Sequence, residues 1–406
     1  MFYWLHRTRR VVQTWQVWLG GAIALCLIAA HALVAADLLY ADVQALVKLG
    51  ARAAGSSRAE RASEYLISEY RKAGYQVEIQ TFTYPKFADA GSSLITDGKT
   101  IEAWALVRSV AGNVTGQLVA VPNFGRTEDF KAVNVRDQIA IVQRGGGLQF
   151  AEKIENAAAA GAIGILMVNN QPGNVRGMLL KASTIPAASL SQEVGTSLLQ
   201  QAQSTSILAA LRVRAQPNAI GRNVIAHLSD VKQPQLIIGG HYDSVEHSPG
   251  ANDNASGTAV VLGLARSLSK SPQARQVWFV SFDGEEDGLK GSEAFVDRAT
   301  SQFLTGLKAM LNFDMVGIND RLLLDGSGAV SAIASSIHGT VSSNQLGGSD
   351  HLSFKAKNVP TLFFFRGKDP NYHSPGDKIV DPRLLRETQA AALKIIPTIL
   401  NQTSSR

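Results

Sequence analysis

Side chains that can bind metal ions follow several apolar segments in the second half of the chain. These apolar segments lie at 235–240, 276–282, 309–313 and 361–365. The residues that come after them are His241, Asp243, Asp253, Glu285, Glu286, Asp314 and His373. Each one alone has an ordinary structural explanation, such as a helix cap or a solvated pair of charges. Their concentration behind four apolar segments favours one shared metal site.

The chemistry of this set suits divalent ions such as zinc. Histidine nitrogens and carboxylate oxygens are ligands that zinc accepts. Two ions about 3.5–4 Å apart can hydrolyse amides and esters, and one carboxylate must then bridge them. A further carboxylate has to remain free of metal so that it can accept the proton of the attacking water. Glu285 and Glu286 are adjacent, and neighbouring side chains on an extended backbone point in different directions, so they can divide these two tasks.

Strands and helices alternate over residues 217–406, which predicts an α/β domain. Helical patterns at 257–268 and 383–400 fall between or after the apolar segments. Such alternation is typical of a mixed, mostly parallel central sheet flanked by helices. Functional groups collect at the carboxyl ends of strands in sheets of this kind. We therefore expect the fold to bring the metal-binding residues together.

The preceding part of the chain divides into two regions with different sequence patterns. Residues 37–87 contain an amphipathic helical pattern followed by an alternating strand, and we assign them to the same domain as 217–406. Residues 88–216 contain short apolar runs, glycine-rich turns and one alanine-rich helix at 150–160. This region has no histidine, so a hydrolase metal site is not expected there. We predict that it is a smaller α/β domain inserted into the first.

The N-terminal 36 residues resemble a targeting segment. Three arginines, Arg7, Arg9 and Arg10, precede a nearly uncharged stretch that ends in small residues. This pattern predicts a secretory signal peptide. A retained membrane anchor is the alternative, because residues 17–36 are about long enough to span a bilayer. Either interpretation predicts export: secretion, a periplasmic location, or a membrane tether with the rest of the chain outside the cytoplasm.

Composition excludes several other classes of protein. The chain has 406 residues, a formal net charge of +6, 45% hydrophobic residues and 18% charged residues, which is a globular balance. The single cysteine, Cys26, excludes an intrachain disulfide and a cysteine-rich zinc site. Outside the N-terminal segment there is no run of lysine and arginine, so we do not expect nucleic-acid binding. Oligomeric state is left open.

Six short segments resemble the di-zinc aminopeptidases of the aminopeptidase Y and aminopeptidase S type. They are HYDS (241–244), GANDNASG (250–257), FDGEEDGLKGS (282–292), LNFDMVG (311–317), SDHLSF (349–354) and YHSPGD (372–377). The resemblance implies the zinc exopeptidase fold. Residues 143–170 and 184–195 resemble a protease-associated (PA) domain inserted into that fold. The usual cysteine of the PA pattern RG-x-C-x-F is missing, and Gly147 and Leu148 occupy that stretch.

This resemblance implies two zinc ions per chain and assigns five of the residues noted above to them as ligands. One zinc is assigned to His241 and Asp314, the other to Glu286 and His373, and Asp253 bridges them. The peptide bond after Asp253 is cis in such relatives.

The resemblance also implies roles beside the metal ligands. Glu285 is the general base, Asp243 orients His241, and Tyr372 can donate a hydrogen bond to the developing oxyanion. His351 is a candidate for the substrate pocket.

Two further residues lie close to these positions in the sequence. Asp377 is a candidate for supporting the metal ligands, whereas His247 is expected in a loop.

The resulting prediction is an exported zinc aminopeptidase that acts on peptides with a free N-terminus. A carboxypeptidase of the glutamate-releasing kind is an alternative, although such relatives carry a long helical domain after the peptidase core and only a short stretch follows His373 here. A non-catalytic binding protein that uses the PA-like domain is another alternative. An intact Glu285 beside Glu286 argues against it, because a purely structural metal site needs no spare base.

Overall fold

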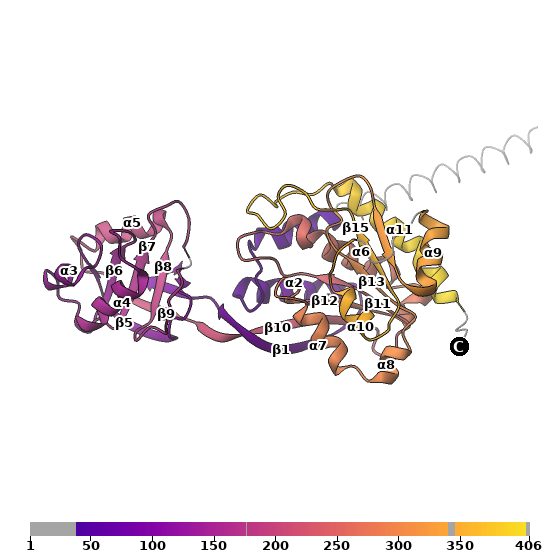
Figure 1. Ribbon diagram of the computed structural model, residues 1–406, viewed down its shortest axis with the longest axis horizontal. Helices are drawn as coiled ribbons and strands as arrows, with labels where there is room; N and C mark the ends of the chain where they lie inside the picture. The colour runs from indigo at the N-terminus through magenta and orange to yellow at the C-terminus, as the bar shows by residue number, and fades with distance from the viewer. Residues whose placement is uncertain (1–37, 176, 340–345, 403–406) are drawn as a thin grey trace, which may run out of the picture. The chain divides into compact units, whose positions relative to one another are not determined.

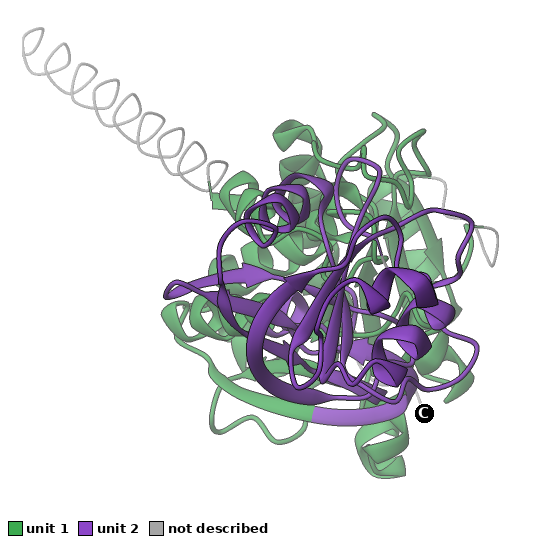
Figure 2. Cartoon of the chain, turned by 90° about the vertical axis from the view of Figure 1, so that its left-hand side faces the viewer, with its two compact units in different colours: residues 1–52, 61–80, 222–406 green, residues 53–60, 81–221 purple. Residues whose placement is uncertain are grey.

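The chain forms two units, each built around its own β-sheet (Figure 1). The computed structural model describes residues 38–175, 177–339 and 346–402. The first unit takes its described residues from 1–52, 61–80 and 222–406, and the second from 53–60 and 81–221 (Figure 2). The predicted signal peptide or anchor at 1–36 lies outside the described residues. Within the described ranges, no helix is both long and apolar enough to cross a membrane.

A seven-stranded sheet organises the first unit, with strand order β1-β10-β12-β11-β13-β15-β14. The three central pairings, β11 with β12, β11 with β13 and β13 with β15, are parallel, whereas β10 with β12 and β14 with β15 are antiparallel. The strands are β1 (Gln76–Asp89), β10 (Ala215–His227), β11 (Leu236–His241), β12 (Val277–Phe282), β13 (Ala309–Phe313), β14 (Leu323–Gly326) and β15 (Thr361–Phe365). The predicted mixed, mostly parallel α/β fold is confirmed.

Helices cover both faces of this sheet, which is why its central strands are apolar throughout. On one face α6 packs against β11 and β13, α11 packs against α6, and Tyr70 of α2 contacts Phe279 of β12. On the other face α7 and α10 contribute Phe295 and Phe354 to a cluster with Ile237 and Met310 of the strands. The helices of this unit include α2 (Ser57–Lys72), α6 (Gly257–Leu268), α7 (Lys290–Arg298), α8 (Ser301–Thr305), α9 (Gly328–His338), α10 (His351–Ala356) and α11 (Pro382–Asn401).

Strand β1 is longer than the sequence pattern suggests. The alternation predicts a strand over 75–84, but β1 continues through Pro85 to Asp89. Proline is tolerated because β1 is the outermost strand of the seven, and an edge strand does not need every N–H group for the ladder.

An eight-stranded sheet with the order β3-β2-β9-β5-β6-β7-β8-β4 forms the second unit. Two hydrophobic clusters pack on it, one around Leu166 and Leu211 and the other around Ile165 and Met167. Its elements are β2 (Ser93–Thr96), β3 (Lys99–Glu102), β4 (Trp104–Ala105), β5 (Gly112–Ala120), α3 (Thr127–Lys131), β6 (Ile139–Gln143), α4 (Phe150–Ala159), β7 (Gly164–Val168), β8 (Ala187–Leu190), α5 (Gln192–Gln201) and β9 (Leu208–Val213). The predicted helix at 150–160 corresponds to α4.

Candidate metal centre

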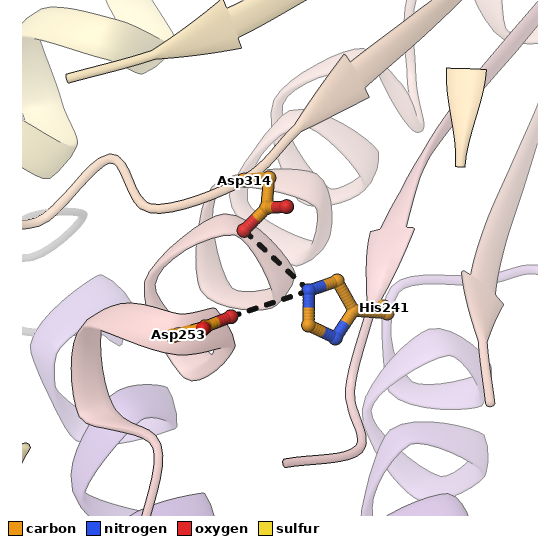
Figure 3. Close-up of side chains that lie close together, drawn as sticks. All are labelled: His241, Asp253 and Asp314. Carbon is orange, nitrogen blue, oxygen red and sulfur yellow. Dashed lines mark ion pairs between the residues drawn. The ribbon is translucent and has the colours of Figure 1, made fainter. Parts of the chain in front are cut away.

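Two neighbouring parallel strands carry the first group of site residues. His241 is the last residue of β11, and Asp314 directly follows β13. The register pairs Gly239 with Asn312, so His241 and Asp314 are level with each other and lie on the same face of the sheet. The Nε2 atom of His241 lies 3.4 Å from Oδ1 of Asp314 (Figure 3).

Asp253 reaches the same place from the turn segment Ala251–Ser256, which leads into α6. Its Oδ1 atom lies 3.4 Å from Nε2 of His241 (Figure 3). The peptide bond between Asp253 and Asn254 is cis, as the resemblance implied. The Asn254 side chain ties the segment to β13, because its Nδ2 donates to the carbonyl of Phe313 and its Oδ1 accepts from the amide of Met315. The turn is thereby fixed against the end of the strand that precedes Asp314.

The other oxygen of Asp253 faces a second group. Its Oδ2 atom lies 3.2 Å from Nε2 of His373, and the same nitrogen lies 3.0 Å from Oε2 of Glu286. Glu286 comes from the turn after β12, and His373 from the loop after β15. His241, Asp253 and Asp314 offer one set of ligand atoms within 4.8 Å of one another, and Asp253, Glu286 and His373 offer another. All five predicted metal-binding residues are brought together, with Asp253 common to both sets.

The arrangement fits divalent cations. Ligand atoms about 2.0–2.1 Å from a tetrahedral ion lie about 3.3 Å from one another, close to the separations between histidine nitrogens and carboxylate oxygens in both sets. Buried His241 Nε2, Asp314 Oδ1 and Glu286 Oε1 have no hydrogen-bond partner among the described residues. A buried polar atom without a partner is costly, and a bound cation would supply the missing interaction.

The buried carboxylates also need positive charge. Burial raises the pKa of Glu285 to about 9 and that of Glu286 to about 10, and nearby Asp314, Asp243 and Asp253 add to the effect. Cations between these groups would favour their ionised forms.

Glu285 and Asp243 lie beside the two sets without belonging to either. The Glu285 Oε2 atom lies 3.8 Å from Nε2 of His241. Asp243 Oδ1 lies 3.4 Å from the Nδ1 atom of His241. The Asp243 carboxylate also accepts hydrogen bonds from the backbone amides of both Glu285 and Glu286, at 3.2 Å each. The side chain expected to orient one histidine therefore also holds the turn that presents both glutamates.

The other predicted residues are more scattered. The Tyr372 ring stacks on that of His373 with centroids 3.7 Å apart, and burial raises the pKa of its hydroxyl. The Asp377 carboxylate accepts hydrogen bonds from the backbone amides of Asn252 at 2.7 Å and of Asp253 at 3.0 Å. His351 is buried and stacks on Phe363 of β15. His247 is exposed in a loop. The catalytic role of Tyr372 and the pocket role of His351 stay predictions.

Sequence reasoning missed two buried charged residues near this centre. Asp350 is fully buried, burial raises its pKa to about 7, and neither carboxylate oxygen has a hydrogen-bond partner among the described residues. It stands next to His351 in a segment that the resemblance already marked, so a signal was present. Arg52 is also fully buried and contacts the segments that carry His241 and Asp253. It lies far away in the sequence, where no pattern distinguishes it from other arginines.

Comparison with known proteins identifies both parts of the chain. The sequence model of peptidase family M28 matches residues 223–396, and the sequence model of the PA domain matches residues 114–198. Aminopeptidase YwaD of Bacillus subtilis is 32% identical over 359 residues, a match that covers 82% of this chain and 77% of YwaD. The chain belongs to peptidase family M28.

Two further similar proteins are consistent with this membership. The probable lipoprotein aminopeptidase LpqL of Mycobacterium tuberculosis is 31% identical over 77% of this chain and 64% of its own length. The solved structure of BSAP, a zinc aminopeptidase from Bacillus subtilis, has a TM-score of 0.54 and 28% identity, covering 91% of this chain and 96% of that one. The predicted family, the inserted PA domain and the metallo-exopeptidase class are thereby confirmed.

Proposed function

We propose that this member of the family is an exported aminopeptidase with two zinc ions and with Glu285 as general base. The observation that carries the proposal is the division of the site into two ligand sets that share Asp253. The two oxygens of Asp253 face different histidines, which is the arrangement a bridging ligand requires. Glu285 lies next to these sets and belongs to neither.

When bound, the zinc ions would polarise the scissile carbonyl and lower the pKa of a water molecule. Glu285 then accepts the proton of the attacking water and returns it to the leaving amine. The Tyr372 hydroxyl donates a hydrogen bond to the carbonyl oxygen as negative charge develops there. Asp243 keeps the Nδ1 side of the His241 ring occupied, so that Nε2 is directed at the metal.

Two observations support the finer parts of the proposal. Similar proteins are named aminopeptidases, which favours peptides with a free N-terminus as substrates. The N-terminal 36 residues have the pattern of a signal peptide or anchor, and one relative is named a probable lipoprotein aminopeptidase. Export, by secretion or with a membrane tether, is consistent with both.

The decisive experiment compares substrates that differ only in their termini. Zinc-loaded protein is assayed on aminoacyl p-nitroanilides, on the same compounds with an acetylated amine, and on N-blocked peptides with a free carboxylate. We expect hydrolysis of the first set alone, and turnover about 10²–10⁴-fold slower with zinc-loaded Glu285→Gln. Preferred cleavage of N-blocked peptides would indicate a carboxypeptidase, and no cleavage of any substrate would overturn the proposal.

A further inference from the structure

We propose that Arg52 is a positioning residue of the metal centre, whose guanidinium holds the backbone segments that present His241 and Asp253. The inference rests on the proposed function in that these two residues are taken as metal ligands. Arg52 follows the helical residues 38–48, and the whole inserted region 88–216 separates it from His241 in the sequence. It is completely buried in the first unit.

The hydrogen bonds of the Arg52 side chain go to main-chain carbonyls. Its Nε donates to the carbonyl of Tyr242 at 2.8 Å, directly after His241. Its Nη2 donates to the carbonyl of Gly250 at 3.0 Å, and Nη1 donates to the carbonyl of Pro249. One planar fork thus joins the chain after β11 to the start of the loop that carries Asp253, a geometry that a lysine ammonium cannot reproduce.

The main chain of Arg52 reinforces this connection. Its amide donates to Oγ of Ser244 at 2.9 Å, and its carbonyl accepts the amide of Ser244 at 3.4 Å. The Ser244 hydroxyl in turn donates to the carbonyl of Ser248 at 2.9 Å. The loop from 242 to 250 is therefore attached to residue 52 at both of its ends.

Asp377 also holds the loop that carries Asp253, but it accepts hydrogen bonds from this loop whereas Arg52 donates them. The Arg52 guanidinium donates hydrogen bonds to the carbonyls of residues 249 and 250, whereas the Asp377 carboxylate accepts hydrogen bonds from the amides of residues 252 and 253. A cation and an anion thus hold consecutive parts of one short segment. Asp253 follows the residues that Arg52 holds and is itself held by Asp377, so the position of its carboxylate depends on both side chains.

The guanidinium carries its charge at neutral pH. Burial lowers the pKa of Arg52 to about 10, while Asp243, Asp377, Asp253 and Glu286 act in the opposite direction. Burying a cation costs desolvation free energy that an apolar side chain in the same core position would not cost. Its retention next to the two ligand segments is explained by the geometry that it imposes on them.

The test compares Arg52→Lys and Arg52→Ala with a matched control, Arg266→Met. Arg266 is also largely buried, but its guanidinium pairs with Asp42 and Glu69, which do not belong to the metal centre. The metal-free and zinc-loaded forms of each variant are examined by thermal unfolding, by zinc competition against a fluorescent chelator, and by kcat and KM on an aminoacyl p-nitroanilide. Added guanidinium tests whether the missing group can be replaced in Arg52→Ala.

We expect both Arg52 variants to bind zinc about 10–100-fold more weakly, the usual effect of losing a residue that orients metal ligands. Guanidinium should restore part of the zinc affinity of Arg52→Ala. Arg266→Met should lower the unfolding temperature but leave zinc affinity unchanged. Wild-type zinc affinity in folded Arg52 variants would overturn the proposal, and so would failure of both variants to fold.

The two levels of inference fail in distinguishable ways. A wild-type protein that binds zinc but does not cleave aminoacyl substrates contradicts the aminopeptidase function and leaves the zinc measurements as a valid test of Arg52. A wild-type protein that binds no zinc contradicts both.

Discussion

Asp253 is the residue on which the two ligand sets converge, and its side chain is placed by backbone interactions on both sides. A lone carboxylate of this kind could be a simple helix cap, since α6 begins four residues later. Its oxygens instead face His241 and His373 separately. Charge at this position is what would hold two cations close together.

Asp253→Asn should therefore weaken zinc binding more than any other single ligand change, because a neutral amide cannot offset the repulsion between two divalent ions. His241→Ala should weaken chiefly one binding step and His373→Ala chiefly the other. Calorimetric zinc titration of the metal-free proteins separates these patterns. Two zinc ions bound by Asp253→Asn at wild-type affinity would contradict the bridging role.

Glu285→Gln should retain its metal and lose about 10²–10⁴-fold in kcat, because only the general base is removed. Metal content by atomic emission, measured beside kcat, checks this prediction. Glu293→Gln is the matched control, since Glu293 pairs with Lys290 at the surface, and it should behave like the wild type. Loss of one zinc equivalent from Glu285→Gln would instead make Glu285 a ligand.

Metal removal should make the stability of the protein fall as pH rises. In the folded chain burial raises the pKa of Glu285 to about 9 and of Glu286 to about 10, from ordinary values near 4.5. Between about pH 5 and pH 9 the folded state then holds more protons than the unfolded state, so the free energy of unfolding decreases with pH. Urea midpoints of metal-free protein at several pH values test this. The zinc-loaded form should show a flatter dependence, and equal slopes would count against the prediction.

At the scale of elements, the strands that carry ligands were the easiest to predict. β11, β13 and β15 are buried on both faces and form continuous apolar runs, and each is followed by a polar turn. Their ligands could be predicted because the carboxyl ends of parallel strands meet at one edge. Contacts such as Arg52 with Tyr242, or Asp377 with Asn252, could not be predicted, because they join loops whose paths depend on the packed fold. Asp243 was expected at His241, but its hold on the glutamate turn is visible only in three dimensions.

The start of α6 packs against β13 too closely for any side chain. A Cβ atom at Gly257 would lie 2.2 Å from the carbonyl oxygen of Phe313, although the backbone there is ordinary helix with φ of −65°. Gly257→Ala should lower the free energy of unfolding by about 1–3 kcal/mol through overpacking. Urea unfolding measures the change. Gly348→Ala is the control, because its added methyl meets only the flexible end of Leu352, and a Gly257→Ala protein no less stable than this control would refute the close approach.

At the scale of the whole chain, the two units have separate sheets and separate hydrophobic clusters. The ligand sets lie entirely within the first unit. The sequence pattern indicated this division, because the inserted region has no histidine and its apolar runs are short. The domain limits at 87/88 and 216/217 remain predictions, and the compact units divide at 80/81 and 221/222.

Replacing residues 88–216 by a short glycine-serine linker should leave a folded, zinc-binding first unit. The clusters lost with this segment lie in the second unit, whereas the cluster beneath α7 and α10 stays intact. Calorimetry should show one cooperative transition, and a zinc titration should match the full chain. A deletion variant that neither unfolds cooperatively nor binds zinc would show that the boundaries are wrong.

Strands β1 and β10 lead the chain out of the first unit and back into it, and they are hydrogen-bonded neighbours in its sheet. The exit and the return therefore sit side by side, held by the sheet itself. Doubling the length of a flexible connection costs only about 0.6 kcal/mol in closure entropy. The size of whatever lies between the two strands is thus nearly irrelevant to the stability of the scaffold. The segment between these two strands can therefore differ in length with little effect on the residues of the two ligand sets, which all lie in the first unit.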